Sequence, residues 1–537
     1  VTPLELTQTD VKLGTGADLI TNTAGTSNTR IGVNAGNSIA SGGNFNVALG
    51  DEAGTAITTG DGNVFTGYAS GDALTLGSSN TAVGRDSLGA DTLGNNSVAI
   101  GRNSLTTQNF TTATDVYNTA VGFSAGTAIT TGLHNTLIGG LAGDALTDAD
   151  ENVAVGLGAL TADTLGSHTV AIGRGALETQ NFTTATDSNN TAVGTFAGRA
   201  VTTGIKNNLI GAESGDALTV GTRNVALGTQ ALSSDTKGSR SVAVGQGALF
   251  TQNFTTATDT YNVAVGYEAG VSMTTGIQNT IMGGLAGDAL TVGTRNVAVG
   301  INALSGDTKG SRSVAIGLSA LFTQNFTTAT DNYNVAVGAV AGAAITTGTN
   351  NNLIGGRAGA SLTDADFNVA IGRNALSADT LGSTSIAIGH AALETQNFTS
   401  AANTYNVAIG HVAGQSITTG SVNTLIGGLS GDAITTGVYN VTLGVSTLGA
   451  NTGAHKNTAI GSNSMVAFNV TSNTDTFNTA VGYGSAISLT TGVQNTFVGA
   501  LAGDDLTTGS NNTIIGYGCN INAVGQDHGI ALGHNVG

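Results

Sequence analysis

The sequence predicts an all-β fold, a parallel β-solenoid of about 28 rungs, fibrous and assembled as an intertwined or side-by-side homotrimer. The first observation is a set of glycines, from Gly32 to Gly533, whose spacings follow the pattern 17, 17, 17, 21 in a superperiod of 72. The second is that each of these anchor glycines closes a short apolar run such as Asn262-Val-Ala-Val-Gly266. A short period sustained along a chain indicates stacked copies of one small unit.

Each repeat reads as one rung of the solenoid. The Asn-x-Ala-Val-Gly run has the β propensity of a short strand, and its glycine permits a backbone corner that a Cβ would obstruct. Further along, a segment such as Ala125–Gly132 or Ala231–Gly238 predicts a second short strand and another corner. In most repeats an asparagine lies four residues before the anchor glycine, with Ser in most of the others. This asparagine is either a plain turn residue or, because stacked rungs align it, part of a hydrogen-bonded ladder.

The strand is apolar on both faces, which favours an oligomer. Val before the glycine and Ala before Val point to opposite faces, and a strand apolar on both faces is buried on both. We expect the Ala face to meet another chain, since small side chains let backbones approach. Bulky residues replace this Ala in every fourth rung and predict interlocking layers: Phe65, Leu137, Leu209, Ile281, Leu353, Leu425 and Phe497.

Two segments are expected in the chain. Residues 28–537 form the repeat rod, whereas residues 1–27 do not follow the repeat. This N-terminal segment is expected to cap the first rung or to pair with the last rung of a neighbouring subunit. An upstream leader or attachment region is compatible with a chain that begins at Val1.

Composition excludes several classes of function. The net charge of −18 and the scarcity of Lys and Arg argue against nucleic-acid binding. The sequence has no apolar stretch of about 20 residues, so no helical membrane span is expected. A single cysteine, Cys519, excludes an internal disulfide. No cofactor is predicted.

The extra residues of each longer rung form a candidate binding site. The insertion reads Thr107-Gln-Asn-Phe-Thr-Thr-Ala-Thr-Asp115 and recurs once in each superperiod, in degraded form around Phe468 and Phe477. Periodic aromatic side chains on loops can stack on glycans or on protein ligands. In the alternative, which we favour, each Phe folds back over its own widened rung. The candidate binding ridge comprises Phe110, Tyr117, Phe182, Phe254, Tyr261, Phe326, Tyr333, Phe398 and Tyr405.

Three acidic residues offer a weak calcium site. Asp144, Asp148 and Asp150 lie in one loop, and their oxygens are of the kind that calcium binds. The equivalent loop at 219–223 reads Thr-Val-Gly-Thr-Arg, so a solvated loop is the better interpretation. The prediction is therefore that no metal is bound.

Catalysis has little support in the sequence, and the chain is not expected to be an enzyme. The histidines occupy different repeat positions and form neither metal-ligand spacing nor a Ser/His/Asp pattern. They are His134, His168, His390, His411, His455, His528 and His534.

The strand motif resembles two families. The run at 96–101, Asn-Ser-Val-Ala-Ile-Gly, resembles the head repeats of trimeric autotransporter adhesins, which are left-handed parallel β-rolls wound as homotrimers. The longer run at 118–132, and the run at 514–521, look like repeats of phage tail-fibre proteins. The resemblance covers residues 28–537 and implies an extracellular, cell-surface or virion fibre.

The leading hypothesis for function is a structural and adhesive extracellular fibre, a repeat shaft whose loops attach to a cell-surface glycan or protein receptor. One alternative is a filament subunit joined end to end through its termini. A less favoured alternative is an ice- or mineral-binding solenoid, since the Thr-Thr pairs occur only once in each superperiod.

Overall fold

The computed structural model describes residues 23–521 and 524–537. The expected segment 1–27 therefore lies mostly outside the described residues. By its internal contacts the chain divides into two compact units: residues 1–241 with 253–259, and residues 242–252 with 260–537. Both units are built from the same rung, and the described residues form an all-β parallel solenoid of about 30 turns without a helix.

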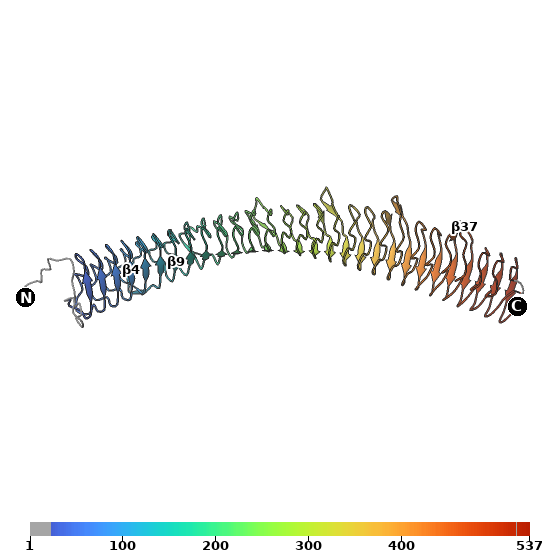
Figure 1. Ribbon diagram of the computed structural model, residues 1–537, viewed down its shortest axis with the longest axis horizontal. Helices are drawn as coiled ribbons and strands as arrows, with labels where there is room; N and C mark the ends of the chain where they lie inside the picture. Colours follow the sequence, from blue (N-terminus) through green and yellow to red (C-terminus); the bar gives the residue numbers. More distant parts are fainter. Residues whose placement is uncertain (1–22, 522–523) are drawn as a thin grey trace, which may run out of the picture. The chain divides into compact units, whose positions relative to one another are not determined.

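Every rung contributes one three-residue strand to a parallel ladder, and each strand ends just before its anchor glycine. Figure 1 shows these strands as successive parallel arrows. In the first unit they are β1 (Thr29–Ile31), β2 (Val47–Leu49), β3 (Val64–Thr66), β4 (Thr81–Val83), β6 (Val98–Ile100), β8 (Thr119–Val121), β9 (Thr136–Ile138), β10 (Val153–Val155), β12 (Val170–Ile172), β14 (Thr191–Val193), β15 (Asn208–Ile210) and β16 (Val225–Leu227).

The second unit continues the same pattern. Its strands are β18 (Val242–Val244), β20 (Val263–Val265), β21 (Thr280–Met282), β22 (Val297–Val299), β24 (Val314–Ile316), β26 (Val335–Val337), β27 (Asn352–Ile354), β28 (Val369–Ile371), β30 (Ile386–Ile388), β32 (Val407–Ile409), β33 (Thr424–Ile426), β34 (Val441–Leu443), β36 (Thr458–Ile460), β38 (Thr479–Val481), β39 (Thr496–Val498), β40 (Thr513–Ile515) and β41 (Ile530–Leu532).

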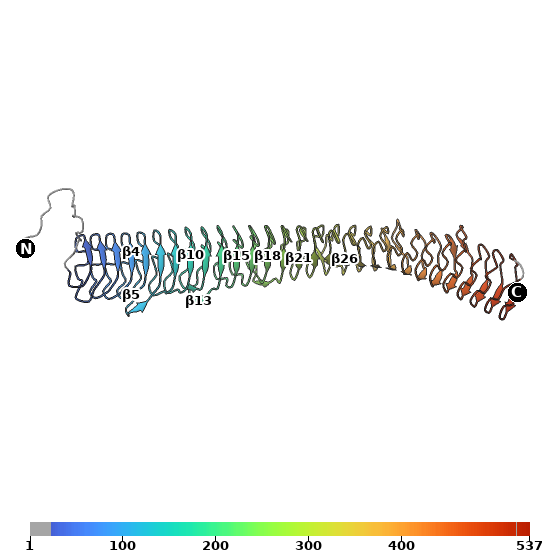
Figure 2. The same cartoon turned by 60° about the horizontal axis from the view of Figure 1, so that its bottom comes forward.

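Each insertion adds one short parallel pair. The pairs are β5 (Gly94–Asn95) with β7 (Thr114–Asp115), β11 (Gly166–Ser167) with β13 (Thr186–Asp187), β17 (Gly238–Ser239) with β19 (Thr258–Asp259), β23 (Gly310–Ser311) with β25 (Thr330–Asp331), β29 (Gly382–Ser383) with β31 (Ala402–Asn403), and β35 (Ala454–His455) with β37 (Thr474–Asp475). In Figure 2, β5 and β13 lie along a different edge of the rungs from β4 and β10.

The register of the ladder places equivalent residues directly above one another. In the second unit, Ala336 of β26 aligns with Leu353 of β27, which aligns with Ala370 of β28. The asparagine column is confirmed as a ladder: the backbone N–H of Asn351 donates to Oδ1 of Asn334 at 2.9 Å, and its Nδ2 donates to the carbonyl of Ala365 at 2.7 Å. These amides are wholly buried, so the ladder satisfies polar groups that would otherwise be costly.

In the rungs that the structure describes, the segment expected to form a second strand is folded into turns instead. In segment 338–348 the N–H of Ile345 turns back to the carbonyl of Gly342 at 3.1 Å, whereas the N–H of Ala344 bonds the next rung. Gly342 has a φ of +56°, in the left-handed region. Successive backbone N–H groups thus bond alternately to a carbonyl of the next rung and to one of their own rung. This side of the solenoid is therefore a stack of turns, because a strand would bond only to its neighbouring strands.

The orientation of the strand is the reverse of the expected one. The middle residue of each strand, usually Ala, faces the interior of its own chain, and the flanking Val or Ile faces outward. The bulky residues that replace this Ala, such as Leu353, are fully buried inside the rung. Their assignment to layers between chains is therefore wrong.

The bulky residues instead match glycines of the same chain. Leu353 lies between Gly342 and Gly359: a Cβ on either glycine would come within 2.7 Å of a Leu353 methyl carbon. Where the strand carries Ala387, the corresponding positions hold Leu376 and Leu393, all fully buried. Large and small residues thus exchange places from rung to rung, which keeps the interior filled.

Candidate binding ridge and outer strand face

The insertions are held to the preceding rung by a buried polar cluster. Oδ1 of Asp307 accepts hydrogen bonds from the backbone N–H groups of Gly310 at 2.9 Å and Phe326 at 3.2 Å. Oδ2 accepts a 2.6 Å bond from Nε2 of Gln324, which also donates to Ser313 Oγ. The Gln324 carbonyl oxygen accepts from Asn334, so the cluster links the insertion to the asparagine ladder.

Burial raises the pKa of the carboxyl groups in this cluster. Desolvation is the largest cause for Asp91, Asp307 and Asp379, and it outweighs the Gln and backbone hydrogen bonds that lower the pKa. This cluster was not predicted from the sequence. Its signal is the replacement of Ile or Leu, seven residues after the anchor glycine, by Asp in one rung and Gln in the next.

The structure separates the Phe and Tyr members of the candidate ridge. Phe110, Phe182, Phe254 and Phe326 are only 5–7% exposed, and Phe398 is half-buried. The Phe182 ring lies over Gly166 of the preceding rung, where a Cβ would come within 2.8 Å of it. These rings cover the rung, as the favoured alternative holds, and offer little surface to a ligand.

The tyrosines are exposed, and one of them, Tyr333, lies against a charged side chain. Tyr117, Tyr261, Tyr333 and Tyr405 are 48–56% exposed, and each has a φ near +52° that turns its side chain out of the ladder. The Arg312 guanidinium carbon lies 5.4 Å from the centre of the Tyr333 ring. Arg312 Nε is also 2.9 Å from Oδ2 of Asp331, so the guanidinium is held between insertion and ladder.

The outer strand face carries Val and Ile instead of the Ala that the sequence predicted there. We define it as the residues one and three positions before each anchor glycine. Ile316, Ile354 and Ile371 of this face are 36–41% exposed. No position of the face carries a charged residue: one column is Ile, Val, Leu or Met except at Thr66, and the other is Thr, Val, Ile or Asn. Although the chain has a net charge of −18, the outer strand face of each unit is therefore uncharged.

The three candidate calcium ligands do not converge. Asp144 accepts a hydrogen bond from Thr161 Oγ1, Asp148 from Thr131 Oγ1 at 2.5 Å, and Asp150 from the backbone N–H of Leu133 at 2.7 Å. Each carboxylate thus ties its loop to a neighbouring rung. Among the described residues, no group of three or more His, Cys, Asp or Glu is placed to hold a metal ion.

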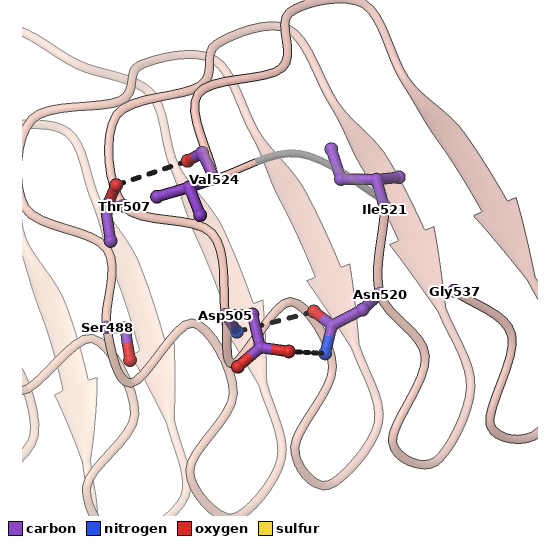
Figure 3. Close-up of a pocket in the computed structure, with 7 residues that line it drawn as sticks. All are labelled: Ser488, Asp505, Thr507, Asn520, Ile521, Val524 and Gly537. Atoms are coloured by element: carbon purple, nitrogen blue, oxygen red, sulfur yellow. Dashed lines mark hydrogen bonds between the residues drawn. The ribbon is translucent and has the colours of Figure 1, made fainter.

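A shallow pocket of about 460 Å³ lies near the C-terminal rungs (Figure 3). Asn520 and Asp505 face each other across it, and Asn520 Nδ2 donates to the Asp505 carboxylate at 3.2 Å. The two main polar side chains of the pocket are therefore hydrogen-bonded to each other. Its remaining lining residues are Ser488, Thr507, Ile521, Val524 and Gly537.

The histidines remain dispersed along the rungs. His390 and His411 stack with ring centres 5.3 Å apart, and His168 Nδ1 lies 3.0 Å from Asp187 Oδ1.

The described residues include no helix that is apolar over a membrane-spanning length. No protein-family model and no curated protein sequence matches this chain.

Proposed function

We propose that this chain is the shaft of a structural and adhesive extracellular fibre, on a cell surface or a virion, and that it acts without catalysis. The observation that carries the proposal is the outer strand face. Its side chains are uncharged, mostly β-branched, and half-buried or exposed in every described rung, and apolar surface that repeats in this way marks an interaction site.

The occupant of that face is another copy of the same chain. The face repeats with the strand spacing of about 4.8 Å. A second copy carries the same repeat, so it offers each rung an equivalent contact, and weak contacts add along the shaft. The resemblance to trimeric adhesin heads supports three copies.

The adhesive part of the proposal rests on the exposed tyrosines. They recur on the insertions, each combines an apolar ring with a hydroxyl, and Arg312 and Asp331 flank Tyr333. Aromatic rings with adjacent charged groups suit stacking on sugar rings, and repetition along the fibre multiplies a weak affinity. The ligand class proposed is a cell-surface glycan or a protein receptor.

Sedimentation of the full chain at low concentration tests the assembly. We expect a mass close to three chains of 52.6 kDa. The variant I316E/I354E/I388E places charges on the outer strand face and should dissociate. The control I301E/L318E changes residues that are 58% and 52% exposed but lie after the anchor glycine, and should stay assembled. A soluble wild-type monomer contradicts the proposal.

A further inference from the structure

Two positions of the insertion are the same in all six copies, although the insertion as a whole diverges. Between residues 107 and 117 and their equivalents, only the Asn at position 109 and the Thr at position 111 never change. Core positions do change: Gln108 is replaced by Phe468 in the sixth copy, and Phe110 by Val470. The six Asn-x-Thr triplets begin at Asn109, Asn181, Asn253, Asn325, Asn397 and Asn469.

The fold accounts for the asparagine of this triplet. Its Oδ1 accepts a hydrogen bond of 2.9–3.1 Å from a threonine hydroxyl of the preceding rung, as in Thr308 to Asn325. This hydrogen bond to Oδ1 fixes the position of the asparagine side-chain amide. Within the described residues its Nδ2 makes no hydrogen bond, and the side chain is exposed in five copies and half-buried in the sixth.

The fold does not account for the threonine. Thr111 and its equivalents are exposed, and their hydroxyls have no hydrogen-bond partner in the part of the chain that the structure describes. Neighbouring threonines that do bond the loop are less strictly kept: Thr330 Oγ1 donates to the carbonyl of Thr328, yet Ala402 stands at the equivalent place in the fifth copy. A free hydroxyl kept in every copy points to recognition by another molecule. The equivalents of Thr111 are Thr183, Thr255, Thr327, Thr399 and Thr471.

We propose that these six asparagines are N-glycosylation sites. Asn-x-Thr, with x other than Pro, is the acceptor sequence for a sugar on the asparagine amide, and it requires an exposed loop. The donor is a glycosyl diphosphate on a nucleotide or a lipid carrier. Nδ2 forms a bond to C1 of the sugar, the bond from C1 to the phosphate oxygen breaks, the diphosphate carrier leaves, and Nδ2 loses one proton.

The arrangement suits a modification that coexists with assembly. The asparagine oxygen stays bonded to the preceding rung while its nitrogen carries the sugar, so attachment breaks no hydrogen bond of the fold. The insertions lie along a different edge of the rungs from the main ladder (Figure 2), so the sugars start away from the outer strand face. This inference goes beyond the proposed fibre function and does not depend on the oligomeric state.

The chain contains matched control triplets with the same sequence pattern. In Asn95-Asn96-Ser97 the serine is wholly buried and accepts a 2.9 Å bond from Gln108 Nε2. In Asn440-Val441-Thr442 both polar side chains are wholly buried. A transferase that needs a free hydroxyl next to an exposed amide should leave both triplets unmodified once the rungs have formed.

Peptide mass spectrometry of the full chain, purified from its natural producer, tests the proposal. We expect a sugar mass on the six insertion asparagines and none on Asn95 or Asn440. A glycan-free protein overturns the proposal, and so does modification of the control triplets with sparing of the insertions.

Two variants of the full chain, made in the same producer, separate recognition from folding. Replacing the six threonines by Ala should abolish the sugar mass, whereas T111S and its five equivalents should retain it, with the same β-sheet circular dichroism in both. Sugar retained in the Ala variant contradicts the proposal. Tunicamycin, which blocks synthesis of lipid-linked donors, removes the sugar if the carrier is a lipid and spares it if the carrier is a nucleotide.

Discussion

Gln324 donates a 2.6 Å hydrogen bond from Nε2 to Oδ2 of Asp307, and both side chains are wholly buried. This pair joins the rung that precedes an insertion to the rung that carries it. The same pairing holds Asp91 to Gln108, Asp163 to Gln180 and Asp379 to Gln396. A buried carboxylate without a cation is costly, so the pair predicts a particular pH dependence of stability.

Acid should stabilise this pair. Burial raises the pKa of Asp91, Asp307 and Asp379 above their ordinary value of 3.8. The folded chain therefore binds these protons more tightly than the unfolded chain. Their contribution is fully present below pH 3.8 and is lost as the pH rises through the raised pKa values. Thermal unfolding followed by circular dichroism across this range should show a smaller change for D91N/D307N/D379N than for the wild type.

The control for this experiment is D148N/D364N, which changes two exposed carboxylates. It should keep the pH dependence of the wild type. Parallel curves for the triple variant and the wild type would show that the buried pairs do not titrate as proposed.

The complementary sizes of Leu353 and its two glycines predict a large cost for one added methyl group. In G342A the new Cβ would lie 2.7 Å from Leu353 Cδ1, at a backbone φ of +56°. Overpacking and left-handed strain together should cost about 2–4 kcal/mol of unfolding free energy. Thermal or urea unfolding measures this loss. G356A is the matched control, since a Cβ there meets nothing within 4 Å, and it should change stability by less than about 0.5 kcal/mol.

The asparagine ladder predicts a cost for removing one amide from its interior. In N351A the carbonyl of Ala365 and the N–H of Asn368 both lose their partners inside the rung. Each buried unsatisfied group costs about 1–3 kcal/mol, so urea unfolding should show a loss of at least that size. N352A, which changes an exposed residue of β27 that has no left-handed φ, should be close to neutral. Equal stability of the two variants would mean that the ladder does not hold the rungs together.

The two halves of the candidate ridge predict opposite phenotypes. F326S removes a ring that is 5% exposed, and should lower the unfolding free energy by about 2–4 kcal/mol. The variant Y117S/Y261S/Y333S/Y405S changes only exposed rings, so its melting temperature should stay near that of the wild type while binding to cells or glycan arrays falls. The measurements are thermal unfolding and binding to a glycan array.

If the tyrosine variant binds as well as the wild type, the ridge is not the adhesive surface. If the tyrosine variant unfolds as readily as F326S, the tyrosines stabilise the fold, and a loss of binding then does not support an adhesive role.

The rung and its repetition follow from the amino-acid sequence alone. An anchor glycine closes every repeat after a short apolar run that Asn usually precedes, and parallel stacking is the arrangement in which equivalent residues of such repeats meet. The position of the insertions and the stacking of asparagines followed from the same spacing, because a repeat places its own copies next to one another.

Which face of the strand lies inside depends on the packing of the folded chain and does not follow from the sequence pattern. Ala and Val alternate, and both are apolar, so hydrophobicity alone does not assign the faces. The choice depends on volume: Leu353 fills the space left by Gly342 and Gly359, whereas Ala387 leaves room for Leu376 and Leu393. The burial of Phe326 and the exposure of Tyr333 also depend on the folded chain. The Phe326 N–H is held by a hydrogen bond to Asp307, and Tyr333 has a left-handed backbone conformation.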